Sequence, residues 1–324
     1  MKRKLSPVLL VLFLFTFGGV LSATTLFYSV GPDNAGVPRN FNSIPSAGPA
    51  PTSLFNLGDG SLGFDGGLTY QPTDGRFYAV ANDGSGNSTL ESFTLGGAAT
   101  LTTVFSLGTG FLSGLTFDSA DGNLYAITDD SISGHSFLDR LNLGTSTVTQ
   151  VLDLGLGFEG GGLFNGGLTF NPVNEKLYAL GSDNNNGVSR PLYEMDLGTS
   201  TVTFKFNLGD GSLSFNGGLL FHPGNGLFYV ISNDANANSE LNSFSLAGGA
   251  GSLTPLFSLG QGFNNVGLTE IPSIPEPSTG ILFATAATAL IALRRLRGRR
   301  TNGRAIILKL TKEVQSCVRI RTMC

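Results

Sequence analysis

The sequence contains no tryptophan, and only 13% of its 324 residues are charged, whereas an average globular chain has about 25% charged residues. Few lysines and glutamates are present, while glycine (46) and phenylalanine (25) are abundant. This composition argues against a helical protein, because its common residues favour turns and strands. A hydrophobic fraction of 41% also excludes a disordered chain.

Cysteine is absent from residues 24–316, because the two cysteines, Cys317 and Cys324, lie in the last eight residues. A disulfide framework is therefore excluded for this stretch, even if the protein is exported.

Positive charge is scarce in the middle of the chain. Residues 24–279 hold six lysines and arginines but 22 aspartates and glutamates, a net charge of −16, although the whole chain carries only −4. Such a charge disfavours nucleic acid and anionic lipid as partners. It is compatible with cations and neutral glycans.

Residues 1–23 have the organisation of a secretory signal peptide. Lys2, Arg3 and Lys4 precede an apolar run at 8–17, and small residues lead to a cleavage position after Ala23. The run is shorter than the roughly 20 residues that a spanning helix needs. We expect export, with an uncleaved N-terminal anchor as the alternative.

A second apolar stretch, residues 280–293, is followed by a basic cluster at 294–300. This is typical of a transmembrane helix whose arginines stay in the cytoplasm, which places the preceding domain outside. The stretch is short for a bilayer core of about 30 Å, so the arginines would snorkel or the membrane would thin. The cluster contains Arg294, Arg295, Arg297, Arg299 and Arg300.

Pro275, Glu276 and Pro277 stand in the linker 273–279 before this stretch. Tripeptide, apolar helix and arginines, in this order, resemble the PEP-CTERM sorting signal of Gram-negative bacteria. The resemblance covers residues 275–300 only. It implies processing near the motif by an exosortase, transient anchoring in the inner membrane, and export with extracellular polysaccharide or biofilm matrix. An ordinary C-terminal anchor is the alternative.

Residues 301–324 depart from the pattern of that family, which usually ends soon after the arginines. This basic tail is either a short cytoplasmic helix or an added stretch without function, and it puts the efficiency of processing in doubt.

The middle of the chain is a repeat. A Gly-Leu pair opens an apolar run five times, at intervals of 47, 53, 51 and 49 residues. In each complete unit a run centred on tyrosine follows, and then two further runs of strand length. Four strands in about 50 residues is the period of a β-propeller blade. The pairs begin at Gly67, Gly114, Gly167, Gly218 and Gly267.

The two ends of the repeat region complement each other. Residues 25–66 supply the later strands of a unit and lack the first, whereas residues 267–272 supply only a first strand. Together they make one blade, which closes the ring and removes exposed edges. The sequence therefore predicts an all-β, five-bladed propeller over residues 24–272.

An aspartate follows each tyrosine by five residues, at Asp33, Asp83, Asp130, Asp183 and Asp234. A short carboxylate after the second strand is typical of a turn, where it accepts backbone N–H bonds. Fivefold repetition favours this structural role. Calcium binding by the Asn/Asp-rich loops of single blades is the alternative.

In a propeller the first strand of each blade lines the central channel. Asn or Asp beside Phe precedes the predicted first strand of several blades, a combination that suits sugar hydroxyls and sugar faces. Turn chemistry is the competing interpretation. The candidate ligand rim consists of Asp65, Asn165, Asn216, Asn264 and Glu270.

Catalysis has little support, because no zinc spacing, phosphate loop or dinucleotide fingerprint occurs. We interpret His135 and His222 as incidental surface residues. Asp65 and Glu270 are the one carboxylate pair that could act on a glycoside. The leading hypothesis is an exported, non-catalytic binding or matrix protein without a cofactor, with polysaccharide as its ligand. The alternatives are a glycoside-active enzyme and a purely structural surface protein.

Overall fold

The computed structural model describes a propeller within residues 26–272. The described ranges are 26–31, 39–46, 48, 50–64, 67–96, 100–130, 132–156, 167–182, 189–215, 218–249, 253–263 and 267–272. The predicted signal peptide (1–23), the linker 273–279, the apolar stretch 280–293, the arginine cluster 294–300 and the tail 301–324 lie outside them.

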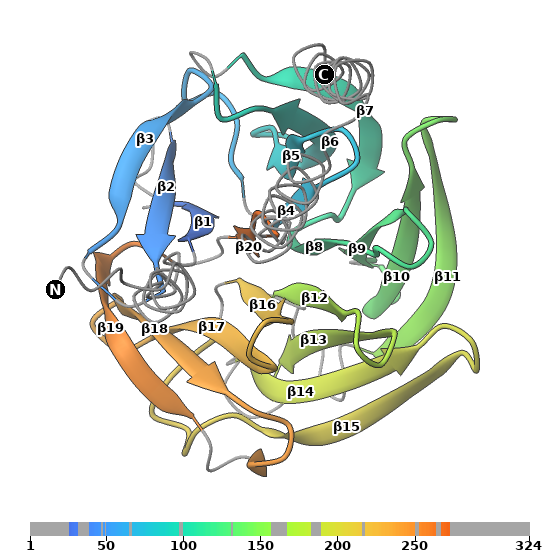
Figure 1. The fold of residues 1–324 in the computed structure, drawn as a ribbon. Coiled ribbons are helices and arrows are strands. Elements are labelled where there is room, and N and C mark those ends of the chain that lie inside the picture. Colours follow the sequence, from blue (N-terminus) through green and yellow to red (C-terminus); the bar gives the residue numbers. More distant parts are fainter. Residues whose placement is uncertain are drawn as a thin grey trace, which may run out of the picture. The chain divides into compact units, whose positions relative to one another are not determined.

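Twenty strands form five four-stranded antiparallel sheets, which confirms the predicted all-β fold and blade number (Figure 1). From the centre outwards, the first blade is β4 (Leu68–Gln71), β5 (Arg76–Asn82), β6 (Asn87–Phe93) and β7 (Thr102–Thr109), and the second is β8 (Ser113–Phe117), β9 (Leu124–Asp129), β10 (His135–Asn142) and β11 (Thr147–Leu156). The third blade is β12 (Leu168–Asn171), β13 (Lys176–Ser182), β14 (Ser189–Asp196) and β15 (Thr201–Asn207), and the fourth is β16 (Leu219–His222), β17 (Leu227–Asn233), β18 (Asn238–Phe244) and β19 (Thr254–Gln261).

The fifth blade, here the closing blade, combines both ends of the repeat region as the sequence predicts. It runs β20 (Leu268–Glu270), β1 (Leu26–Val30), β2 (Arg39–Pro45) and β3 (Thr52–Leu57). β20 pairs antiparallel with β1, so that Phe27 lies opposite Glu270 and Ser29 opposite Leu268. The innermost strands β4, β8, β12, β16 and β20 contact one another in a ring.

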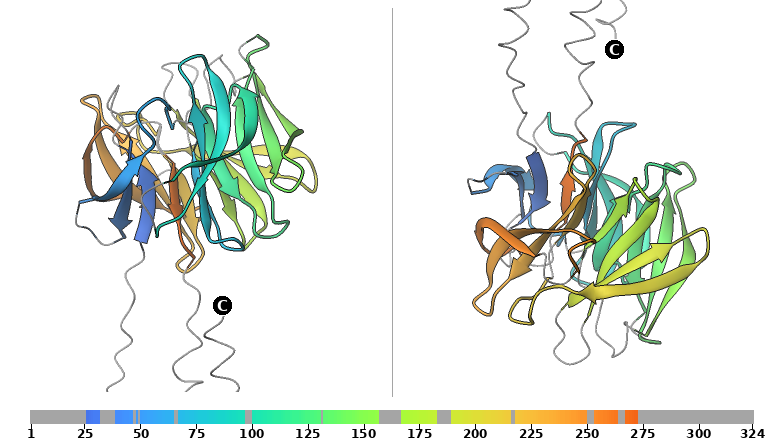
Figure 2. Two further views of the ribbon diagram at one scale, coloured as in Figure 1. Left: turned by 90° about the horizontal axis from the view of Figure 1, so that it is seen from above. Right: turned by 60° about the horizontal axis from the view of Figure 1, so that its bottom comes forward.

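Seen from the side, the strands run between two faces of the ring (Figure 2). We call one the turn face, because the turns after the first and third strands of the first four blades lie there, together with the turn after the third strand of the closing blade. The other is the loop face, which carries the turns after the second strands and the loops that lead to the next blade. This division follows from the antiparallel order of every sheet.

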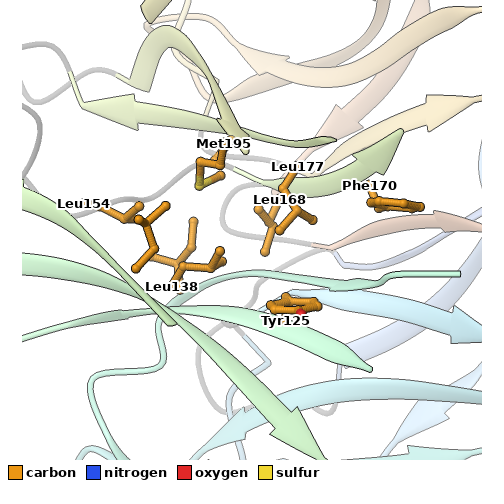
Figure 3. Close-up of a cluster of buried hydrophobic side chains, with 10 residues drawn as sticks. Tyr125, Leu138, Leu154, Leu168, Phe170, Leu177 and Met195 are labelled. Atoms are coloured by element: carbon orange, nitrogen blue, oxygen red, sulfur yellow. The ribbon is translucent and has the colours of Figure 1, made fainter. Parts of the chain in front are cut away.

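The hydrophobic core lies between blades rather than within one layer. Five buried clusters occur, each with side chains from two adjacent blades. Aromatic and aliphatic side chains thus cover both faces of every sheet, which explains the high phenylalanine content. Figure 3 shows one cluster, with Tyr125, Leu138 and Leu154 of the second blade and Leu168, Phe170, Leu177 and Met195 of the third.

The glycine of each Gly-Leu pair is required by close packing at the ring centre. A Cβ atom built on Gly167 would lie 2.0 Å from the backbone nitrogen of Leu219 in the next blade. At the other four pairs it would lie 2.1 to 2.4 Å from the leucine of the next blade. No side chain fits at such distances, so the glycine allows neighbouring inner strands to approach.

The outer strand pair of every blade contains a register shift, for example between Phe41 and Asn42 in β2. Such bulges increase local twist and make an exposed edge less suitable for pairing with another chain.

Candidate functional site

Threonine hydroxyls join the inner strands around the ring. The Oγ1 atom of Thr69 accepts the N–H of Phe117 at 3.0 Å, and Thr116 accepts that of Phe170 at 3.2 Å. The hydroxyl of Thr169 accepts a hydrogen bond from the N–H of Phe221 at 3.0 Å, and the hydroxyl of Thr269 accepts one from the N–H of Tyr70 at 3.1 Å. The sequence analysis did not predict these contacts. Their hydrogen bonds satisfy backbone donors that the four-stranded sheets leave on the channel side.

The junction between the fourth and closing blades departs from this pattern. Leu220 occupies the threonine position in β16 and has no hydroxyl. Glu270 occupies the position at which the other four blades carry an aromatic residue, Tyr70, Phe117, Phe170 or Phe221.

A histidine–carboxylate pair spans this junction instead. The Nδ1 atom of His222 lies 2.6 Å from Oε2 of Glu270, and the side chains are 17% and 8% exposed. The imidazole ring has Phe27 and Tyr229 as neighbours, each with its ring centre 6.3 Å away. The interpretation of His222 as an incidental surface residue is therefore wrong. The sequence missed its role because residues 222 and 270 become neighbours only when the ring closes.

Glu270 is the one member of the candidate ligand rim that the structure describes. It lies at the end of β20, on the turn face, and its carboxylate packs between two blades. Asp65, Asn165, Asn216 and Asn264 lie outside the described residues, so the proximity of Asp65 and Glu270 remains a prediction.

The repeated aspartates that the structure describes hold turns on the loop face. The carboxylate of Asp83 accepts the N–H groups of Ser85 and Asn87 at 2.8 and 2.9 Å, and the side-chain amide of Asn87 at 2.8 Å. Asp234 makes the equivalent three bonds in the fourth blade. These donors stabilise the charged carboxylate, which lowers the pKa of both aspartates.

Asp130 has the same turn role in the second blade, where it accepts the N–H of Ile132 at 2.9 Å and the hydroxyl of Ser133 at 2.6 Å. The predicted turn role is thus observed at all three described positions, while Asp33 and Asp183 lie outside the described residues. Across the described chain, no three His, Cys, Asp or Glu side chains gather into a metal-binding group.

Tyrosine hydroxyls form a second repeated contact, which the sequence analysis missed. The hydroxyl of Tyr78 donates to Asp74 at 2.5 Å, and that of Tyr125 to Asp121 at 2.6 Å. Burial and the adjacent carboxylate together raise the pKa of both tyrosines. An Asp or Asn four residues before the tyrosine is the sequence signal for this contact in the first four blades. In the third and fourth blades the direction is reversed, because the side-chain amides of Asn174 and Asn225 donate to the hydroxyls of Tyr178 and Tyr229 at 2.8 Å.

His135 lies on the surface of the second blade. Its Nδ1 atom is 3.0 Å from the carboxylate of Asp153. The side chain of His135 is 33% exposed and that of Asp153 is 52% exposed. An exposed pair of this kind contributes little to stability.

No protein-family model and no curated protein matches this sequence. Among solved structures, an exo-β-1,3-galactanase from Phanerochaete chrysosporium, determined with β-1,3-galactotriose, is similar with a TM-score of 0.51 at 9% identity over 73% of this chain and 61% of that one. TolB from Acinetobacter baumannii gives a TM-score of 0.48 at 13% identity over 72% of this chain, which spans about half of that protein (53%). A TolB homologue from Agrobacterium tumefaciens gives 0.44 at 15% identity, over 76% of this chain and 91% of that one. At these identities the similarity shows the propeller fold alone.

Within the described residues, no helix has the length and apolarity needed to cross a membrane.

Proposed function

We propose that this chain is an exported, non-catalytic binding protein of the cell surface or extracellular matrix, and that its propeller binds polysaccharide. The observation that carries the proposal is the order of the parts. A signal peptide precedes the propeller, and a Pro-Glu-Pro motif, an apolar stretch and an arginine cluster follow it. The domain would be anchored by residues 280–293 and processed near residues 275–279 by an exosortase-type enzyme.

The charge of the domain supports a neutral glycan as the ligand. With a net charge of −16 between residues 24 and 279, the domain repels polyanions such as nucleic acid and acidic polymers. The side chains of the candidate ligand rim, Asp and Asn beside Phe, can hydrogen-bond sugar hydroxyls and pack against sugar faces.

The contacts of the described carboxylates support a non-catalytic role. Asp83, Asp130 and Asp234 use their oxygens to hold turns, and Glu270 is engaged with His222 in a buried contact. A glycosidase requires two carboxyl groups that face a sugar across an open site.

Mass spectrometry of the mature protein tests the sorting step. We expect a C-terminus near residues 275–279, and a matched variant with alanine in place of Pro275, Glu276 and Pro277 should retain the C-terminal residues up to Cys324. An intact Cys324 on the native protein would overturn the processing step.

Retention on immobilised polysaccharides, including the matrix of the producing cell, tests the binding step. We expect retention on neutral polymers that persists as the salt concentration rises, and weak retention on anionic ones. If no polysaccharide retains the protein, sugar binding is overturned. Hydrolysis of a glycan that is lost in Glu270→Gln would overturn the non-catalytic role.

A further inference from the structure

The inner strands pack most closely at their loop-face ends. They begin there with the Gly-Leu pairs, where the neighbouring backbone leaves no room for a Cβ atom. The opposite ends reach the turn face, and Figure 1 shows β8, β12, β16 and β20 around the centre of the ring. Side chains of the inner strands can therefore meet a ligand at the ring centre from the turn face.

One position at these turn-face ends is polar in each of the first four blades. It ends the inner strand or directly follows it, and it is occupied by Gln71, Asp118, Asn171 and His222. Thr169 lies two residues before Asn171, on the same side of β12, and its hydroxyl accepts the N–H of Phe221 in β16. Asn171 therefore lies beside the end of β16, so that Asn171 and His222 are neighbours in the ring.

The amide of Asn171 is held in one orientation. The residue is 5% exposed, and its Oδ1 atom accepts the N–H of Val173 at 2.9 Å. Within the described part of the chain, the Nδ2 atom has no hydrogen-bond partner. Asn171 thus offers an oriented donor.

The imidazole of His222 offers an acceptor beside it. The carboxylate of Glu270 can only accept, so Nδ1 of His222 carries the proton in their contact, and Nε2 of the neutral ring is an acceptor. No described residue forms a hydrogen bond with Nε2. Gly224 leaves this atom uncovered, because a Cβ atom built there would lie 2.9 Å from it. The equivalent turn position carries a side chain in the other three blades, namely Thr73, Ala120 and Val173.

The charge around these groups favours a neutral ligand. Asp118 holds the same position in the preceding blade, and burial and the nearby carboxylates of Asp121 and Glu175 raise its pKa. A phosphate or carboxylate group would be repelled here. A hydroxyl group, in contrast, can accept from Nδ2 of Asn171 and donate to Nε2 of His222.

We infer that the turn-face end of the ring centre binds one sugar unit of a neutral polysaccharide, with Asn171 as donor and His222 as acceptor for its hydroxyl groups. This inference rests on the proposed function, which supplies the class of ligand. Glu270 is a positioning residue, because it orients the imidazole. Side chains held in this way are preorganised, and ligand sites use a few such convergent polar groups.

Two variants test the site in the purified full-length chain in detergent. Gly224→Ala places a methyl group against Nε2 of His222, and the φ of Gly224 is not positive. Asn171→Asp replaces the donor by an acceptor but keeps an oxygen for the N–H of Val173, as Asp118 does for Ala120. We expect each variant to lower retention several-fold on an immobilised neutral polysaccharide that retains the native chain.

Val173→Ala is the matched control. It changes the position equivalent to Gly224 in the third blade, where the side chain is 75% exposed, and it keeps the N–H that Asn171 accepts. Its retention should equal that of the native chain. Monosaccharides from acid hydrolysis of the same polymer should elute the native chain. Failure of these sugars to elute it would overturn the binding of a single sugar unit.

The Tm of each variant separates binding from folding. Lowered retention with a Tm close to the native value supports the site. Retention that falls only in step with Tm would overturn it, because the loss would then come from damage to the ring.

The native chain separates this inference from the proposed function. If the native chain and both variants are retained equally, the site is overturned and the proposed function stands. If no polysaccharide retains the native chain, the proposed sugar binding fails and this inference fails with it.

Discussion

The Nδ1 atom of His222 lies 2.6 Å from Oε2 of Glu270, across the junction where the last full blade meets the blade made from both chain ends. This contact stands where the other four junctions have a threonine hydrogen bond and an aromatic residue. The ring is therefore closed at this point by different chemistry, although the glycine packing around it is unchanged.

Glu270→Leu should destabilise the propeller. The substitution removes the carboxylate from a buried site and leaves the imidazole of His222 without its partner, so we expect a loss of about 1–3 kcal/mol in the free energy of unfolding. Urea denaturation measures this loss. Glu270→Gln is the matched control, because its amide oxygen still accepts a hydrogen bond. Its loss in the free energy of unfolding should be smaller than that of Glu270→Leu. Equal stability of Glu270→Leu and the native protein would show that the contact does not hold the ring closed.

Gly167→Ala should be among the most damaging single substitutions in the domain. The new methyl group would lie 2.0 Å from the backbone nitrogen of Leu219, and inner strands cannot separate at one junction without disturbing the ring. We expect a loss of at least about 2–3 kcal/mol in the free energy of unfolding. Gly84→Ala is the control, since no heavy atom lies within 4 Å of its Cβ and its φ is not positive. A free energy of unfolding for Gly167→Ala close to that of the native protein would mean that the inner strands tolerate wider spacing.

Ala237→Gly should stabilise the protein. Ala237 has a φ of +60°, in the left-handed region, whereas the equivalent turn of the first blade carries Gly86 with a φ of +83°. Release of this strain should add about 0.5–1 kcal/mol to the free energy of unfolding. A rise in Tm would confirm the effect, and the reverse change, Gly86→Ala, should lower Tm. A fall in Tm for Ala237→Gly would show that chain entropy outweighs strain in this turn.

The stability of the domain should decrease in acid. Lys176 and the turn donors beside Asp196 lower the pKa of this aspartate from 3.8 to about 2, and turn hydrogen bonds lower the pKa of Asp83 and Asp234. Because the folded-state pKa is depressed, the stabilisation is complete above the unfolded value and is lost as pH falls through the folded value. The urea midpoint should therefore drop between about pH 4 and pH 2.

Asp196→Asn provides the control for the acid effect, because it removes one of the groups whose pKa is lowered. Its urea midpoint should depend less on pH over the same interval than that of the native protein. Parallel curves for the two proteins would show that the ion pair with Lys176 does not contribute.

Much of the fold could be predicted because each blade repeats the same local requirements. Gly167 and its counterparts mark the close approach of inner strands, and the runs centred on Tyr78 or Tyr125 mark the buried second strands. The turn role of Asp83 was also predictable, because an aspartate that hydrogen-bonds backbone groups two and four residues later acts within a short segment.

The contact between His222 and Glu270 was not predictable in the same way. The two residues come from different blades, and each differs from its counterparts in the other repeats, so neither belongs to a repeated pattern. The threonine bonds were missed for a related reason, since Thr69 acts on Phe117 in the following blade rather than on its own strand.

The sequence by itself determined the class of fold, the five blades, the complementary ends and the acidic charge, because these depend on local patterns and on composition. Only the tertiary structure decided which residues meet across the junctions and which face the chain ends leave. Both depend on closure of the ring, which pairs β1 with β20 and brings residues 222 and 270 into hydrogen-bonding distance.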